Sequence, residues 1–126
     1  MFKIGKTGTA TTVVSDNNTA KFIASGSLDV FATPMMIALM ELAACESIAD
    51  SLEPTQTSVG TQINVAHLAA TPLGATVTAK ATILQVGGRK ILFEVTAHDG
   101  VNEIGKGTHE RFVVDAQRFM EKLQQR

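Results

Sequence analysis

The fold of this chain is decided by the stretch from Val30 to Pro54, VFATPMMIALMELAACESIADSLEP. Apolar residues recur here at the spacing of a helix, over a longer run than anywhere else in the sequence. Pro34 suits the first helical position and Thr33 the N-cap before it, while Pro54 marks a stop. Apolar side chains occupy almost every side of this helix, so we expect it to be covered on more than one side.

The sequence after this helix predicts strands, because the apolar pattern changes to the alternation of an extended chain. Gly87-Gly88 and Asp99-Gly100 lie between consecutive apolar runs, and both are strong hairpin signals. Consecutive hairpins predict an antiparallel meander. The predicted strands are residues 57–68, 76–86, 89–98 and 103–114.

The two ends of the chain carry weaker signals. Residues 7–14 and 19–25 are rich in Thr, Val, Ile and Ala, and Asp16-Asn17-Asn18 between them is a turn signal. We expect these two segments to form a hairpin of modest strength. Residues 115–126, DAQRFMEKLQQR, predict a short C-terminal helix.

One long apolar helix with one large antiparallel sheet predicts an α+β domain. A sheet that curls around a central helix covers several of its sides, which is the hotdog architecture. The alternative is a flatter open sheet with the helix on one face. Either sheet leaves edges that a second copy could pair with or cover, so we expect a homodimer.

Length and composition narrow the function. The 126 residues predict a single domain, and 44% hydrophobic with 18% charged residues is typical of globular proteins. A net charge of −1 without a basic run argues against nucleic-acid or membrane-surface binding. Cys45 is the single cysteine, which allows neither an intrachain disulfide nor a zinc site. No signal peptide or membrane-spanning stretch is evident, so we expect a cytoplasmic protein.

Glu41 is a carboxylate in an unexpected place. On a helical wheel Glu46, Ser47 and Asp50 form the polar face, and Glu41 lies about opposite, in a row with Ile37, Cys45, Ile48 and Leu52. A carboxylate there is desolvated, which raises its pKa toward neutrality, where a general base is useful. We expect a catalytic role; partial exposure or a structural partner is the alternative.

His67 is a histidine on an apolar strand face. By alternation it shares that face with Val59, Ile63 and Val65, so it points toward the helix. A lone histidine in such a place is usually a hydrogen-bonded core residue. An inward carboxylate on the only long helix favours a catalytic pair with Glu41 instead.

The remaining polar residues carry less weight. His98 alternates outward beside a turn, whereas His109 in Thr108-His109-Glu110-Arg111 suggests either a pocket wall or an edge. No metal-ligand spacing or phosphate-binding glycine motif occurs, so no metal or cofactor is expected. Gly87-Gly88-Arg89 is a turn signal first, and an arginine that helps to bind a phosphate is its second interpretation.

Several strings together resemble the fluoroacetyl-CoA thioesterase-like family of hotdog proteins. The matching strings are Val30-Phe31-Ala32-Thr33, Met40-Glu41, Gly60-Thr61, His67 with Ala69-Ala70-Thr71-Pro72, Ala97 through Val101, and Gly105 through Arg111. The similarity extends from about Val30 to Phe119, and it is the order and spacing that make it specific.

The resemblance implies a set of site residues and a reaction. The family's catalytic threonine, glutamate and histidine match Thr33, Glu41 and His67, and its substrate-binding glycine and arginine match Gly60 and Arg111. It also implies a dimer with sites near the subunit interface, and coenzyme A as the carrier of the acyl group. We therefore expect hydrolysis of a short acyl-CoA thioester. Glu41 would activate water or attack directly, and a backbone N–H at Gly60 would stabilise the oxyanion.

The sequence departs from the family just before the helix. Ser25 to Asp29 is short and contains no aromatic residue, which argues against fluoroacetyl selectivity but not against thioester hydrolysis. The alternatives are an acyl-CoA-binding protein without turnover, an enoyl-CoA hydratase, and an oligomeric scaffold with incidental polar core residues.

One geometric question stays open. In an unbroken helix Thr33 and Glu41 lie about 12 Å apart along the axis. Either the first turn is irregular, or Thr33 acts across the substrate or in the other subunit's site.

Overall fold

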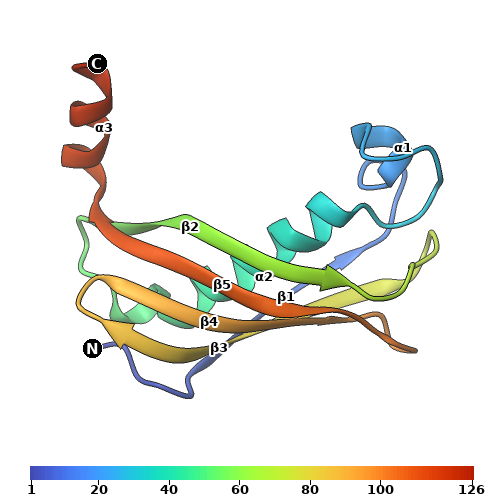
Figure 1. Ribbon diagram of the computed structural model, residues 1–126, viewed down its shortest axis with the longest axis horizontal. Helices are drawn as coiled ribbons and strands as arrows, with labels where there is room; N and C mark the ends of the chain where they lie inside the picture. Colours follow the sequence, from blue (N-terminus) through green and yellow to red (C-terminus); the bar gives the residue numbers. More distant parts are fainter.

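The computed structural model describes residues 1–126, in which one sheet curls around a central helix (Figure 1). Its elements are, in chain order, β1 (Thr7–Val13), α1 (Ala20–Ile23), α2 (Thr33–Ile48), the short 3₁₀ turn η1 (Ala49–Ser51), β2 (Gln56–His67), β3 (Thr76–Gly87), β4 (Lys90–His98), β5 (Glu103–Asp115) and α3 (Ala116–Gln124). The predicted hotdog architecture is confirmed, and the flat open sheet is wrong.

The sheet has the strand order β1-β3-β4-β5-β2, with every neighbouring pair antiparallel. The meander β3-β4-β5 is confirmed, and its turns use Gly88 and Gly100, whose φ angles of 64° and 90° suit glycine. Strand β2 lies beyond β5 and not beside β3, so the meander does not include all four strands. The long strand β2 therefore forms one edge of the sheet, and β1 forms the other.

The predicted N-terminal hairpin is wrong. Strand β1 pairs with β3, and Ala20–Ile23 is a short helix. The Thr19 hydroxyl accepts a hydrogen bond from the Phe22 backbone N–H at 3.2 Å, which caps that helix. The turn after β1 therefore leads into a capped helical turn, and β1 takes its partner from far along the chain.

Helix α2 begins at Thr33, one residue earlier than predicted, with Ala32 at the N-cap. Its buried side is formed by Met36, Leu39, Met40, Ala43, Ala44, Ser47 and Ile48. Glu46 and Asp50 are exposed as predicted, but Ser47 is fully buried. Its hydroxyl donates to the Ala44 carbonyl at 2.6 Å, which satisfies this polar group inside the core.

Gly8 lets strand β1 touch the helix directly. A Cβ atom at Gly8 would overlap the Ala43 carbonyl oxygen and lie 2.5 Å from the Ser47 backbone nitrogen. A side chain at this position would therefore push the strand away from α2.

A β-bulge interrupts strand β2. Gly60 pairs with Arg111 and Gln62 pairs with Glu110, so Thr61 is an extra residue in β2. The sequence predicted that Val59 faces inward, and this is wrong. Because of the bulge, Val59 lies on the outer face, where it pairs with the exposed Phe112. Gly60 and His67, seven residues apart, thereby lie on the same inner face.

Helix α3 confirms the predicted C-terminal helix and stands away from the body of the molecule (Figure 1). The Asp115 carboxylate accepts from the Arg118 backbone N–H at 3.1 Å and caps the helix. None of the helices is both long enough and apolar enough to span a bilayer.

Candidate active site

Thr33 and His67 form a direct hydrogen-bonded pair. Thr33 is the first residue of α2 and His67 the last residue of β2. The Thr33 hydroxyl oxygen lies 2.6 Å from Nδ1 of His67. The helix start and the strand end therefore bring together two of the three residues that the sequence indicated.

The other ring nitrogen of His67 has no partner. Its Nε2 atom is buried and makes no hydrogen bond within the chain. Burial lowers the pKa of His67, which favours the neutral imidazole. The pair opens onto a hollow of about 370 Å³ whose wall includes Ala20, Ser25 and Phe31. An unsatisfied ring nitrogen beside a hollow is suited to a group from outside the chain.

Glu41 lies in a second cluster, with Arg111 and His109 of strand β5. Its Oε2 atom is 3.3 Å from Nη1 of Arg111 and 3.8 Å from Nε2 of His109. The side chain of Glu41 is 39% exposed, so in a single chain it is less desolvated than the helical wheel predicts. The pairing of Glu41 with His67 does not occur within one chain.

Arg111 is held in place by strand β2. Its Nε atom donates to the Ser58 hydroxyl at 2.8 Å, and its Nη2 atom donates to the Ser58 carbonyl at 3.0 Å. These bonds leave Nη1 directed at Glu41 and His109. The guanidinium is therefore positioned to orient the Glu41 carboxylate.

His109 is a buried part of this cluster and not an edge residue, with 1% of its surface exposed. Its Nδ1 atom lies 2.8 Å from the Gln62 carbonyl, which can only accept, so Nδ1 carries the proton. Nε2 then accepts from Arg111 at 3.1 Å. Burial, followed by the charge of Arg111, lowers the pKa of His109 and keeps it neutral.

Gly60 lies directly against this cluster. A Cβ atom at Gly60 would lie 2.7 Å from Oε2 of Glu41, 3.3 Å from the His109 ring and 3.4 Å from Nη1 of Arg111. Only a glycine leaves the carboxylate free at this distance.

The two clusters are far apart within one chain. Helix α2 is regular from Thr33 to Ile48, so an irregular first turn is excluded. Thr33 and Glu41 are therefore about 12 Å apart along the helix axis. Gly60 and His67 are about 20 Å apart along β2. One protomer thus carries two separate halves of the predicted site.

Sequence reasoning missed Ser58 and left His109 undecided. Without the bulge, alternation gave no sign that Ser58 contacts the arginine of β5. His98 is exposed as predicted, and its Nδ1 atom accepts from the Gly100 backbone N–H at 2.9 Å. No group of three or more His, Cys, Asp or Glu side chains lies close enough together to hold a metal ion.

Comparison with known proteins identifies the family. The model of the fluoroacetyl-CoA-specific thioesterase family matches residues 14–117. The chain belongs to this family. The fluoroacetyl-CoA thioesterase of Streptantibioticus cattleyicolor is 50% identical over 98 residues, which cover 78% of this chain and 70% of that protein.

Solved structures agree with this assignment. A structure of a fluoroacetyl-CoA thioesterase is 41% identical, covers 100% of this chain and 98% of that one, and superposes with a TM-score of 0.94. A variant of that fluoroacetyl-CoA-specific thioesterase has been solved with fluoroacetate and CoA; it has a TM-score of 0.88 and 42% identity over 93% of this chain and 98% of that one. A thioesterase superfamily member from Thermus thermophilus has a TM-score of 0.89 at 25% identity, with 99% of this chain and 95% of that one covered. Sequence similarity therefore supports the family assignment, and structural similarity supports the hotdog fold.

Proposed function

We propose that this chain hydrolyses a short acyl-CoA thioester to the free acid and coenzyme A. Thr33, Glu41 and His67 are the catalytic set of the proposal, with Gly60 and Arg111 as substrate-binding residues. The observation that carries it is the Thr33–His67 hydrogen bond beside an unpartnered, buried Nε2 atom, in a member of a thioesterase family.

The proposal joins the two halves of the site across a homodimer. Strand β2 is an edge strand, and its outer backbone groups are free to pair with a second copy. Antiparallel pairing about a two-fold axis near Ile63 and Asn64 brings Gly60 of one subunit next to His67 of the partner subunit. The same pairing brings Glu41 toward Thr33 of the partner subunit. Thr33 thus acts in the other subunit's site.

In this arrangement the proton positions follow from the hydrogen bonds. The Thr33 hydroxyl donates to Nδ1 of the neutral His67 ring, so Nε2 carries the ring proton. Glu41 accepts a proton from water as the water oxygen bonds to the acyl carbon. The carbon–sulfur bond then breaks, and the proton held by Glu41 passes to the departing thiolate, which returns the carboxylate to its starting state. Nε2 of the neutral His67 ring keeps its proton and donates a hydrogen bond that orients the water or the thioester. Direct attack by Glu41 on the acyl carbon is the alternative first step.

Arg111 and Gly60 support this chemistry without taking part in proton transfer. Arg111 orients the Glu41 carboxylate, and the absence of a side chain at Gly60 leaves room for the thioester beside it. A backbone N–H at Gly60 is the proposed oxyanion donor, and loss of such a donor costs about 3 kcal/mol.

Thiol release from a panel of short acyl-CoA esters tests the proposal. We expect turnover by the wild-type protein and a fall in kcat of about 100-fold or more in Glu41→Gln and His67→Ala. Glu46→Gln on the exposed side of the same helix, and His98→Ala on the outer face, are matched controls that keep full activity.

Two results would replace the proposal. Tight binding of coenzyme A esters without thiol release would favour a carrier. Water addition to crotonyl-CoA without thiol release would favour a hydratase. We also propose a cytoplasmic location. The single cysteine and the use of coenzyme A, which is found inside cells, support it.

A further inference from the structure

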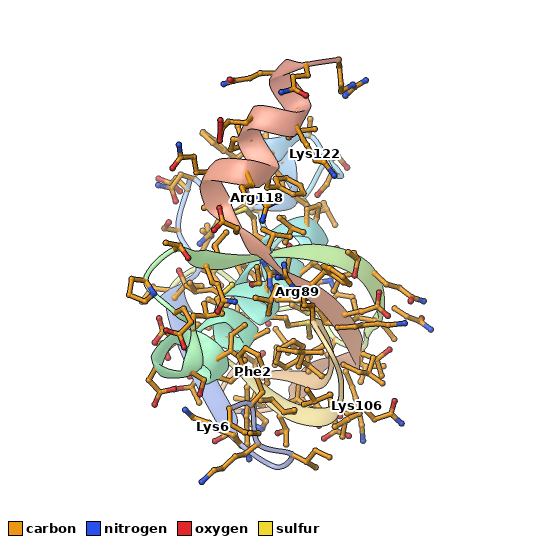
Figure 2. All side chains as sticks on the ribbon, turned by 90° about the vertical axis from the view of Figure 1, so that its left-hand side faces the viewer. Phe2, Lys6, Arg89, Lys106, Arg118 and Lys122 are labelled. Carbon is orange, nitrogen blue, oxygen red and sulfur yellow. The ribbon has the colours of Figure 1, made fainter.

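Three cationic side chains lie around one hollow whose lining includes none of the proposed catalytic residues. Arg89 lies in the β3–β4 turn, and Arg118 and Lys122 lie one turn apart on α3. Together they line a hollow of about 400 Å³. Figure 2 labels all three side chains, with Arg89 at the end of the sheet and Arg118 and Lys122 on the helix above it.

None of these three cations has a partner within the chain. The ion pairs of the molecule involve Lys6 with Asp50, Lys90 with Glu110, and Glu41 with Arg111 and His109. Arg89, Arg118 and Lys122 make no side-chain hydrogen bond or ion pair with any residue. With the two acidic residues of the lining counted against the three cations, the hollow carries one net positive charge in a protein whose net charge is −1, which favours the binding of an anion.

The other residues that line the hollow indicate which chemical groups its ligand carries. Asp115 also lines it, but one of its oxygens is used by the helix cap; Glu121 is the second acid. Phe119 and Val114 form an apolar wall. The lining therefore suits a ligand that carries several phosphate charges together with an aromatic ring.

The hollow lies within reach of the proposed active site. Arg111 and Asp115 are four residues apart on β5, about 13 Å along the strand. Helix α3 begins directly after Asp115 and extends beyond the β2 edge, where the second subunit is proposed to pair (Figure 1). A long flexible arm, such as the pantetheine of coenzyme A, joins two sites at this separation.

We propose that Arg89, Arg118 and Lys122 bind the phosphates of the 3′-phospho-ADP end of coenzyme A. Phe119 offers an aromatic wall to the adenine ring. This inference rests on the proposed function, because it takes an acyl-CoA ester as the substrate. It assigns to Arg89 the phosphate contact that was the second interpretation of its turn sequence.

Kinetics on two thioesters of the same acyl group test the inference. In the combined variant Arg89→Gln, Arg118→Gln and Lys122→Gln we expect KM for the acyl-CoA to rise about tenfold with kcat unchanged. The acyl-N-acetylcysteamine thioester lacks phosphates, and its kcat/KM should not change. Combined Lys3→Gln, Lys80→Gln and Lys106→Gln removes the same charge from exposed sites elsewhere and should leave both substrates unaffected. An unchanged KM in the first variant, or an equal rise in the second, would overturn the inference.

A binding measurement separates this inference from the proposed function. Adenosine 3′,5′-bisphosphate, titrated by calorimetry, should bind the wild-type protein and lose about tenfold in affinity in the Arg89, Arg118 and Lys122 variant. If the wild-type protein binds adenosine 3′,5′-bisphosphate in this way but hydrolyses no thioester, the proposed function is wrong and this inference stands. Hydrolysis with equal nucleotide binding by both proteins would sink the inference alone.

Discussion

The Thr33 hydroxyl binds His67 instead of capping its own helix. A threonine at the N-cap ordinarily accepts a hydrogen bond from a backbone N–H of the first turn, but Ala32 occupies the N-cap here and Thr33 is the first helical residue. Here α2 has no side-chain cap, and Pro34 removes one of the N–H groups that would need one. The residue is therefore committed to the site and not to helix stability.

Replacing Thr33 by valine removes the hydroxyl but keeps the shape of the side chain. We expect kcat for thiol release to fall about 100-fold, because the His67 ring loses the donor that fixes its tautomer. Thr33→Ser should retain most activity. Urea unfolding should show little change in stability for either variant, since no cap is lost. Equal activity of the valine and serine variants would contradict this role.

Gly60→Ala tests how closely the glycine approaches the Glu41 carboxylate. The new Cβ atom would lie 2.7 Å from Oε2 of Glu41, so the carboxylate must move. We expect kcat to fall at least tenfold while the unfolding midpoint stays within a few degrees. Gly87→Ala is the matched control, since nothing lies within 4 Å of its Cβ position. Full activity of Gly60→Ala would show that the site tolerates a side chain there.

Stability should depend on pH through His109. Burial lowers its pKa in the folded chain, whereas in the unfolded chain it titrates near 6.5. Below pH 6.5 the unfolded state therefore binds a proton that the folded state does not, so stability falls as pH is lowered. His67 shifts in the same direction. Unfolding in urea at pH 7.5, 6.5 and 5.5 measures the slope, which should be smaller in His109→Asn. An equal slope in the wild-type protein and in His109→Asn would show that a different group takes up the proton.

At the scale of elements, local signals were sufficient for most of the fold. The four predicted strands agree with β2 to β5 within one residue at each end. Alternation and glycine turns depend only on residues that are close together in the sequence, so they can be recognised without knowledge of the fold. The partner of β1 and the helical turn at Ala20–Ile23 were mispredicted, since pairing with β3 depends on residues more than sixty positions away. The bulge at Thr61 was missed although Gly60 directly before it carries a signal, because a glycine inside a strand often marks a bulge.

Packing of β1 against α2 depends on Gly8. In Gly8→Ala the methyl group would meet the Ala43 carbonyl and the Ser47 backbone, neither of which can turn aside. We expect a loss of stability of about 1–3 kcal/mol by chemical denaturation. Gly87→Ala again provides the control. A loss below about 0.5 kcal/mol would show that β1 shifts freely on the helix.

At the scale of the whole molecule, the residues of the candidate site form two separate clusters within one chain. Sequence placed Glu41 and His67 on inward-facing positions and Thr33 at the helix start, yet it could not tell which of them meet. The reason is physical: alternation and helical spacing give the face of a residue, but not its position along the element relative to a second element. The distance of about 12 Å along α2 separates Glu41 from Thr33 however the sheet packs.

Mixed dimers test whether the site is shared between subunits. Thr33→Ala and Glu41→Gln chains, each inactive alone, should regain about one quarter of wild-type activity when co-expressed, since half of randomly formed dimers carry one intact site. Thr33→Ala mixed with His67→Ala should regain none, because both changes affect the same half of the site. Recovery in neither mixture would show that each chain holds a complete site.

The bulge at Thr61 has a consequence for how this family can vary. A strand repeats every two residues, so positions separated by an odd number, such as Gly60 and His67, face opposite sides. One additional residue between them reverses that parity and lets both lie on the inner face of the sheet. The number of residues between these two positions is therefore constrained more tightly than the residue type at Thr61. A substitution at Thr61 keeps this number of residues, whereas deletion of Thr61 would turn His67 to the outer face of the sheet.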